Sequence, residues 1–389
     1  MERQRNVRGM IEIDGSLGEG GGQLLRSALA LAAWRRIPFR ITHIRARRRE
    51  PGLKAQHLTA VEAVARVCGA VTEGAIKGAD TLTFRPGPVE AGGYGWSVGT
   101  AGATTLVAQA ALPPLWSAAG DSHLRIEGGT HVSWSPPADY LRGVFARTVR
   151  RLGLALDVRL LRHGFYPRGG GILEVRVGGT ASRGAGPHGA GASLPGAGSR
   201  LRWERPPQRR IAISITAVVS SLPRSIAERM LLLAARRLAD KGWKAEERLI
   251  EVRESTGTYL FIAIFPELPP EGEAQGAEWI AGGFTGLGAP GKPAEAVAEE
   301  AVEEALAFLE SDAGVDPRLA DQLLLPALVA GVALEFRTNR MSGHLRSNAE
   351  TVNRFLGPCV RLEEPGAVEI HPARSWPGLF APSRDERHE

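Results

Sequence analysis

One order of strand and helix patterns recurs along the chain, and this recurrence restricts the fold more than any other feature of the sequence. Period-two alternation indicates a strand, and apolar spacing of three to four indicates a helix. The first set is a strand at 10–13, a helix with apolar Leu25, Ala28, Leu29 and Ala32, a strand at 39–44, a helix at 56–68, and strands at 70–73 and 81–85. It predicts a β-α-β-α-β-β unit.

The same order occurs twice more. The second set covers residues 96–98, 104–112, 123–127, 138–152, 154–161 and 171–177. The third covers residues 279–283, 293–310, 319–329 and 332–336, a helix after Ser347, and strands at 359–363 and 367–371. Three copies of one supersecondary unit predict an α/β body (α+β layered), in which helices cover the sheets.

A composition change separates the third copy from the second. Residues 178–210 are rich in Gly, Ala, Pro and Arg and predict a flexible linker. Strands at 211–217 and 259–265 with a helix at 225–241 predict a small inserted α/β domain. The expected divisions are a disordered leader at 1–9, two repeats at 10–179, linker and insert at 180–278, the third repeat at 279–371, and a disordered tail at 372–389.

Charge and cysteine content limit the classes of function. Lys and Arg number 48 against 42 Asp and Glu, giving a net charge of +6, which suits a polyanionic partner but equally a scattered surface charge. No apolar run approaches the ~18 residues of a membrane span. Cys68 and Cys359 form no CxxC pair, so a thiolate zinc site and a disulfide framework are not expected, and the expected location is the cytoplasm.

The segment 341–355, MSGHLRSNAETVNRF, contains a candidate nucleophile. Ser347 and Glu350 have capping-box spacing, which predicts that a helix begins there and that His344 lies in the loop before it. An anion bound at that helix N-terminus would lie close to the imidazole. A neutral imidazole can attack phosphorus, so the arrangement suits nucleotidyl or phosphoryl transfer. The alternative is a hydrogen-bonded loop histidine.

The glycine-rich loop 15–22, GSLGEGGG, precedes a predicted helix and resembles an anion-binding turn. It lacks the GK[ST] of a P-loop and the spacing of a dinucleotide-binding fingerprint, so a tight structural turn is the alternative. Glu19 lies inside the loop, where a carboxylate would repel phosphate unless it holds a divalent cation. Arg26, about one turn into the helix, can reach the same anion.

Residues 45–57, RARRREPGLKAQH, concentrate positive charge between a strand and a helix, where α/β proteins usually contact ligands. Guanidinium groups match phosphate oxygens bidentately. A solvated face is the alternative, and a polyanion site is favoured. Three further glycine or proline loops, at 97–109, 128–140 and 162–171, predict a shared cleft, and His131 and His163 in them are expected to be structural.

Seven motifs together resemble the RNA 3′-terminal phosphate cyclases. They are IDGSLGEGGGQLLRSALALA, RARRREPGLKAQHLTAV, GTAGATTLVAQ, GGTHVSWSPPADYL, RHGFYPRGGG, LADQLLLP and GHLRSN, in this order from about residue 10 to 371. The resemblance implies three repeats similar to the C-terminal domain of translation initiation factor three, with a small inserted α/β domain. It implies ATP and RNA with a 3′-terminal phosphate as substrates, and Mg²⁺ or Mn²⁺ as the metal.

The resemblance also implies a reaction through a covalent histidine-AMP and an RNA-adenylate, ending in a 2′,3′-cyclic phosphate. His344 matches the nucleophile, Asp321 a site carboxylate, and Glu19 a carboxylate near the metal. The positions expected to bind the nucleotide and the RNA phosphate are Arg26, Arg45, Arg48, Gln56, His57, Gln109 and Pro136. Arg318 stands where an aromatic platform for adenine can occur, which leaves the nucleotide preference open.

Other classes remain as alternatives. An inactive relative that binds RNA would need no nucleophile, and a structural RNA-binding protein would act without ATP. An enolpyruvyl transferase also has repeated α/β units but uses no histidine-AMP. The sequence leaves open whether two copies form a homodimer.

Overall fold

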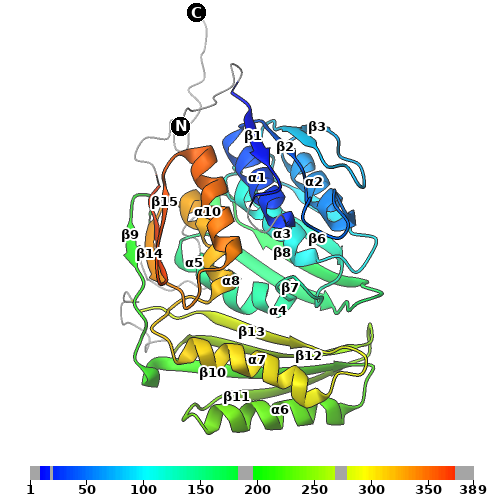
Figure 1. Ribbon diagram of the computed structural model, residues 1–389, viewed down its shortest axis with the longest axis vertical. Coiled ribbons are helices and arrows are strands. Elements are labelled where there is room, and N and C mark those ends of the chain that lie inside the picture. Colours follow the sequence, from blue (N-terminus) through cyan, green and yellow to red (C-terminus); the bar gives the residue numbers. More distant parts are fainter. Residues whose placement is uncertain (1–8, 18–20, 183–195, 268–277, 373–389) are drawn as a thin grey trace, which may run out of the picture.

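The computed structural model describes residues 9–17, 21–182, 196–267 and 278–372. Most of the expected leader and tail, part of the expected linker, and Glu19 lie outside these residues. Within them the strands form four four-stranded mixed sheets with helices packed on them, which confirms the α/β class (Figure 1).

Three of these sheets have the same strand order. They contain β1 (Ile11–Asp14), β2 (Phe39–Thr42), β4 (Leu82–Arg85) and β3 (Val71–Glu73); β5 (Gly93–Ser97), β6 (Ser122–Gly128), β8 (Gly171–Val177) and β7 (Leu156–Arg162); and β9 (Arg200–Arg202), β14 (Ala333–Arg337), β16 (Ala367–Ile370) and β15 (Val360–Glu363). In each, the first two strands pair parallel and the remaining neighbours pair antiparallel.

The helices of these three units meet in the centre of the molecule (Figure 1). They are α1 (Gly22–Arg35), α2 (Ala55–Val67), α3 (Thr104–Trp116), α4 (Ala138–Tyr140) and α5 (Ala146–Arg151) joined by a π-helical turn at Leu141–Phe145, α8 (Pro317–Gln322), α9 (Leu324–Ala330) and α10 (Gly343–Leu356). Helix α1 is buried over most of its circumference, because Leu24, Leu25 and every residue from 28 to 34 are covered by neighbours. Its alanines let α3 and α10 approach closely.

The fourth sheet has the order β11 (Glu246–Val252), β10 (Ile211–Ser220), β12 (Gly257–Pro266), β13 (Gly282–Leu287). Helices α6 (Arg224–Ala239) and α7 (Ala294–Leu309) pack on it and share its apolar core. Figure 1 shows this unit at one end of the molecule.

The structure changes the expected allocation of elements at this unit. The strand near residue 280 and the helix after it were expected in the third repeat, but β13 pairs with β12 and α7 packs on α6. The first strand of the third sheet is instead β9, within the expected linker, where it pairs with β14. Periodicity identifies the type of an element but not its hydrogen-bonding partner, and three residues in a Gly- and Pro-rich stretch give no strand signal. The fourth sheet is therefore inserted between β9 and α8.

Two further features concern the protein's surroundings and its thiols. Among the described residues there is no helix with the length and apolarity needed to cross a membrane. Cys68 and Cys359 are buried free thiols, and burial raises the pKa of each to about 11. Both thiols therefore stay protonated at neutral pH, so neither is prepared to act as a nucleophile.

Candidate active site

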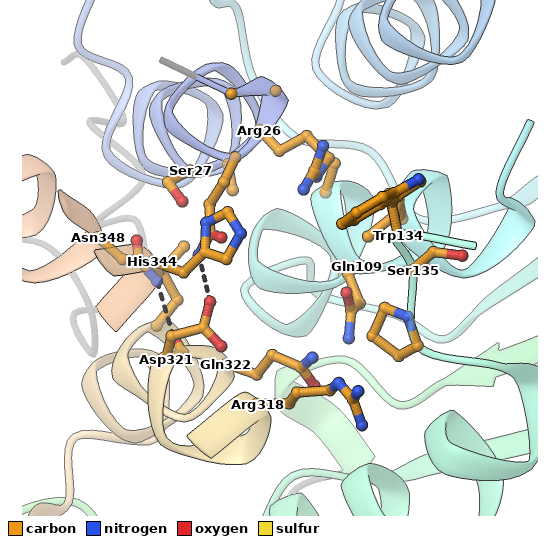
Figure 2. A pocket seen from close by; sticks show the side chains of 18 of the residues that line it. Arg26, Ser27, Gln109, Trp134, Ser135, Arg318, Asp321, Gln322, His344 and Asn348 are labelled. Atoms are coloured by element: carbon orange, nitrogen blue, oxygen red, sulfur yellow. Dashed lines mark hydrogen bonds between the residues drawn. The ribbon is translucent and has the colours of Figure 1, made fainter. Parts of the chain in front are cut away.

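A cavity of about 670 Å³ lies where α1, α2, α3, α8 and α10 converge with the loop after β6 (Figure 2). All of the expected site residues that the structure describes line it: Arg26, Arg45, Arg48, Gln56, His57, Gln109, Pro136, Asp321 and His344. Glu19 lies outside the described residues. The sequence thus predicted which distant segments share one cavity, while the roles of these residues remain predictions.

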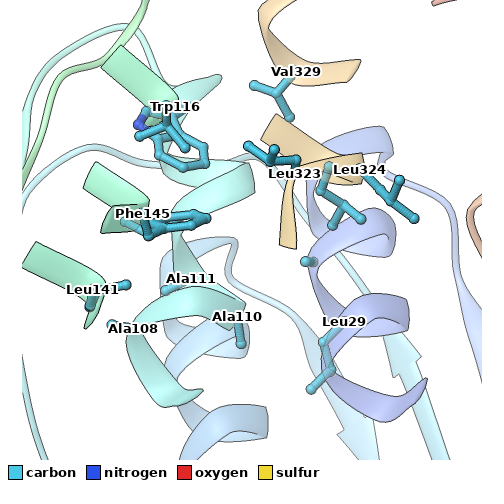
Figure 3. Packing of buried hydrophobic residues seen from close by; sticks show 14 of the residues in the cluster. Leu29, Ala108, Ala110, Ala111, Trp116, Leu141, Phe145, Leu323, Leu324 and Val329 are labelled. Carbon is cyan, nitrogen blue, oxygen red and sulfur yellow. The ribbon is translucent and has the colours of Figure 1, made fainter. Parts of the chain in front are cut away.

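The cavity walls rest on the apolar core of the central helices. Figure 3 shows parts of this core: Leu29 of α1, Ala108 and Ala111 of α3, Leu323 between α8 and α9, and Leu324 at the start of α9. All five side chains are buried. Because a close-packed core resists displacement, it fixes the helices that carry the polar side chains of the site.

The N-terminus of α1 forms a corner of the cavity with the features of an anion-binding site. The helix begins at Gly22 with no side-chain cap, so its first N–H groups are available to a ligand. A Cβ on Gly22 would clash with Nε2 of His57 and come within 3.0 Å of an Nη of Arg26, so only glycine allows both side chains to approach. An Nη of Arg48 lies 3.2 Å from where a Cβ on Gly21 would be. The side chains of Arg26, Arg48 and His57 and the positive end of the helix dipole therefore lie close to Gly21 and Gly22.

The charge state of these donors suits phosphate. Burial lowers the pKa of Arg26 to about 10, which leaves the guanidinium charged at neutral pH. Burial, followed by the charges of Arg26, Arg45 and Lys54, lowers the pKa of His57 to about 3, so its ring is neutral. The Lys54 N–H donates to Nδ1 of His57 at 3.1 Å, which assigns the ring proton to Nε2 on the side of Gly22. His57 is therefore a neutral hydrogen-bond donor in this corner.

The loop 45–57 is held in shape by its own contacts. Arg45 has a left-handed backbone (φ 57°), and its Nη1 donates to the carbonyls of Glu50 and Gly52 at 2.8 and 2.9 Å. Gln56 accepts a hydrogen bond from the Ala103 N–H at 3.3 Å, which connects the loop to the start of α3. Part of the Arg45 guanidinium is thus occupied in fixing the loop that presents Arg48.

His344 lies in the first turn of α10, not in a loop before the helix. The cap is Ser342, whose hydroxyl accepts from the Leu345 N–H at 3.0 Å. The expected capping box at Ser347 and Glu350 is wrong, because the Ser347 hydroxyl donates to the Gly343 carbonyl at 2.7 Å from within the helix. The helix begins five residues earlier than expected and carries His344 on its face toward the cavity.

Asp321 is the buried carboxyl of the cavity. Burial raises its pKa to about 7, although a hydrogen bond from Gln23 and the charge of Arg26 oppose the shift. The Asn348 side-chain amide donates to the Asp321 carbonyl at 2.7 Å. Because Asn348 is one turn along α10 from His344, this bond holds the imidazole on the side of Asp321 (Figure 2).

Other polar atoms of the lining lack a protein partner. Among the buried side-chain atoms of the described residues, Nε2 of Gln109, Oε1 of Gln322 and Oγ1 of Thr285 accept or donate no hydrogen bond within the protein. All three residues line the cavity. Buried polar groups are nearly always paired, so these three atoms are available to bind water or a polar group of a ligand.

Arg318 and Pro136 also line the cavity. The Arg318 guanidinium lies 3.3 Å from the Gly283 carbonyl and 3.4 Å from a Glu304 carboxylate oxygen, which ties it to the fourth sheet. The Pro136 carbonyl accepts from the Thr105 hydroxyl at 2.7 Å, so the proline ring is held against α3.

The two histidines expected to be structural lie outside the cavity, in a buried polar cluster between the second and fourth sheets. Nε2 of His131 is 2.8 Å from Asp139, and Nδ1 of His163 is 2.8 Å from Glu254. The two rings stack with centroids 5.3 Å apart. They join the fourth sheet to the rest of the protein.

Sequence reasoning did not name several residues of the lining, among them Gln23, Asn348 and Trp134. Gln23 and Asn348 are within the quoted motifs GGGQLLRS and GHLRSN, each one turn or less from a chosen residue, and helical spacing from Arg26 or His344 could have identified them. Trp134 had a weaker signal, a large aromatic residue among small and polar ones in a loop.

The arrangement brings together the His344 imidazole, a carboxyl whose pKa burial raises to about 7, and a helix N-terminus surrounded by arginine and N–H donors. The described residues contain no group of three or more His, Cys, Asp or Glu side chains placed to hold a metal ion. Asp321 is the one carboxylate among the described lining residues. That donor set fits a cation held mainly by substrate phosphates and water, as Mg²⁺ commonly is.

Comparison with known proteins identifies similar sequences. Residues 17–362 match the family model described as RNA 3′-terminal phosphate cyclase. A protein of that name from Methylococcus capsulatus is 42% identical over 374 residues, covering 93% of this chain and 96% of the relative. Proteins of the same name from Ralstonia nicotianae and Pseudomonas aeruginosa are 39% and 42% identical, each over 89% of this chain and over 91% and 93% of their own lengths.

Proposed function

This chain belongs to the RNA 3′-terminal phosphate cyclase family, which makes it an enzyme, and we propose that it cyclises RNA 3′-phosphates through a histidine-bound AMP on His344. The observation that carries this proposal is the shared cavity of His344, the buried Asp321 and the phosphate-binding corner at Gly21 and Gly22. A nucleophile facing a phosphate site is what nucleotidyl transfer requires.

In the first step an imidazole nitrogen of His344 attacks the α-phosphorus of ATP. The N–P bond forms while the bond from that phosphorus to the bridging oxygen breaks, and pyrophosphate leaves. The negative charge that develops on the phosphoryl oxygens is stabilised by hydrogen bonds donated by Arg26, Arg48, the His57 N–H and the first N–H groups of α1. The Asp321 backbone carbonyl holds α10, and with it His344, through the bond from Asn348. The Asp321 carboxyl can accept or supply a proton near neutral pH.

In the second step an oxygen of the RNA 3′-phosphate attacks the same phosphorus, the N–P bond breaks, and His344 is released. The vicinal 2′-hydroxyl then attacks the RNA phosphorus, loses its proton, and expels AMP as the leaving group. The cyclic phosphodiester results. This last step needs mainly positioning, because the activated phosphate already carries a good leaving group. The 2′-hydroxyl also restricts the reaction to RNA ends.

The nucleotide would lie with its base toward Pro136 and Gln109 and its phosphates toward Arg26 and Arg48. The unpartnered Gln109 amide can donate to an acceptor on the base. Mg²⁺ or Mn²⁺, held by Glu19 and the substrate phosphates, would neutralise charge on the leaving pyrophosphate.

The shared strand order of three sheets supports three β-α-β-α-β-β repeats of the kind found in the C-terminal domain of translation initiation factor three. We assign the fourth sheet to the inserted domain. We expect the enzyme in the cytoplasm, because its two cysteines suggest neither a disulfide framework nor a thiolate zinc site.

The test is incubation of the pure protein with α-labelled ATP and a divalent cation, followed by denaturing electrophoresis. We expect a labelled protein band that is acid-labile and alkali-stable, and absent in His344→Ala. His43→Ala is the matched control, because His43 is exposed and lies beside Asp14 outside the cavity.

Circular dichroism and thermal melting must show that both variants are folded. A label that persists in His344→Ala, or no label in the folded wild type with either metal, contradicts the proposed nucleophile. RNA with a labelled 3′-phosphate then tests the second and third steps, with the cyclic end as the expected product.

A further inference from the structure

Trp134 has an unusual environment. Its side chain is 98% exposed, yet the residue lines the cavity. Its backbone is left-handed, with φ 65°, a conformation that is unfavourable for a bulky residue. Figure 2 shows the indole across the cavity from His344. Neither packing nor the local backbone accounts for a tryptophan at this position.

The loop around Trp134 is rigidly held on both sides. Val132 is buried and packs with Ala103 and Leu106 of the α3 region. The Ser135 hydroxyl donates to the Val132 carbonyl at 3.0 Å, and the Pro136 carbonyl accepts from Thr105. The indole therefore projects from a fixed frame, so a ligand that stacks on it pays little to order the loop.

An RNA end must cross the rim of the cavity. Only its terminal phosphate and ribose need to reach His344, so the rest of the polymer leaves through the opening. ATP is a single nucleotide, so no further chain extends beyond its base, and Pro136 and Gln109 of the cavity lining can accommodate that base. An exposed aromatic ring at the rim suits the part of the ligand that extends outward, and proteins hold single-stranded RNA by stacking its bases on such rings.

We infer that Trp134 is the stacking platform for the base of the 3′-terminal nucleotide of the RNA substrate. This inference rests on the proposed function and adds a binding residue for the RNA end. Stacking on a ring tolerates any base, so the platform fixes the position of the RNA end without selecting its sequence. The arginines of the cavity hold the phosphate, and the indole aligns the ribose that carries the 2′-hydroxyl.

The test measures binding of a fluorescent RNA with a 3′-phosphate by anisotropy, without ATP. Trp134→Ala is expected to weaken binding roughly 5- to 100-fold, from the usual strength of base stacking. Trp134→Phe should restore most of the affinity. Trp134→Asn suits the left-handed backbone but has no ring, so it should bind as weakly as Trp134→Ala.

Removal of the terminal base from the RNA provides the matching change in the ligand. An RNA ending in an abasic nucleotide should bind wild type weakly and should lose little further affinity with Trp134→Ala, because both changes remove one contact. Tyr166→Ala is the control, since Tyr166 is 78% exposed on a neighbouring loop but does not line the cavity. Its RNA affinity should equal that of wild type.

Equal RNA affinity in Trp134→Ala and wild type would overturn the inference. So would a loss of protein labelling by ATP in Trp134→Ala that matches the loss of RNA binding, because the ring would then hold adenine. The proposed function is judged separately, by labelling and cyclisation in the wild type, so a failure of either idea can be recognised.

Discussion

At the scale of single residues, Asp321 behaves very differently from an aspartate in water. Its carboxyl is buried beside Gln23 and Arg26, and burial raises its pKa from 3.8 to about 7. A carboxyl that titrates near neutral pH can exchange a proton during catalysis, whereas an ordinary aspartate cannot. The same burial has a measurable cost to the fold when the group is charged.

The free energy of unfolding of the Asp321→Asn variant should increase relative to that of wild type as pH rises. A raised folded-state pKa means that the stability contributed by the protonated form is complete below about pH 4 and is lost as pH rises through about 7. The difference between the proteins should be small below about pH 4, grow by about 1.4 kcal/mol per pH unit up to about pH 7, and reach on the order of 4 kcal/mol at most above pH 8. Thermal melting over this pH range measures it.

Asp14→Asn provides a control of opposite sign. Hydrogen bonds from Ser16 lower the pKa of the exposed Asp14 carboxyl, so its contribution is lost as pH falls. A difference in melting between Asp321→Asn and wild type that stays constant from pH 5 to 8.5 would contradict the raised pKa of Asp321. Labelling by ATP should fall in Asp321→Asn, since the amide cannot exchange a proton.

At the scale of elements, the start of α10 determines where His344 lies. The Ser342 hydroxyl caps the helix, and His344 follows in the first turn. His344 is therefore positioned by a helix end and by the bond from the Asn348 side chain to the Asp321 backbone carbonyl. A weakened cap would let this turn fray.

Ser342→Ala should lower the free energy of unfolding by about 1 kcal/mol and slow protein labelling by ATP. Ser347→Ala is the matched control, because its hydroxyl bonds a carbonyl within the helix and alanine favours helices. Urea unfolding and labelling rates measure both effects. If Ser347→Ala is the more harmful change, the helix begins where the sequence motif suggested.

Periodicity in the sequence predicted most elements, because it depends only on neighbouring residues. It failed for strands that form because a neighbouring strand offers hydrogen bonds. Strand β11 contains four charged residues in a seven-residue edge strand, and it was missed because alternation is weak there. Strand β9 forms only because β14 offers a parallel partner. Within the site, glycine loops and arginines were recognisable by chemistry, whereas Gln23 and Asn348 matter through partners on other helices.

At the scale of the whole molecule, two buried polar clusters join the fourth sheet to the others. Asp139 accepts from Tyr259 of β12 at 2.6 Å and lies 2.8 Å from His131 and 2.6 Å from Arg142. Asp316 accepts from Tyr140 at 2.9 Å and from the Gly283 N–H of β13 at 3.1 Å, while it caps α8. The fourth sheet should therefore unfold together with the rest of the chain.

Asp139→Ala should destabilise the protein by roughly 3–5 kcal/mol, because His131 and the Tyr259 hydroxyl would be left buried without their acceptor. Tyr259→Phe should cost only about 1 kcal/mol, because it removes one donor and leaves the others. Urea unfolding followed by circular dichroism compares them. Equal costs for the two changes would show that this cluster does not hold the sheets together.

The wide spread of the cavity residues along the chain also affects how the enzyme is made. Its walls run from Gly21 to Asn348, and His344 is on α10, the last helix among the described residues. On the ribosome, the segments that hold phosphate emerge early, and the nucleophile emerges only after the fourth sheet has been synthesised. A chain whose translation stops before α10 carries much of the phosphate site without the histidine. Under the proposed mechanism such unfinished chains form no histidine-AMP, so aborted synthesis does not release enzymes that consume ATP.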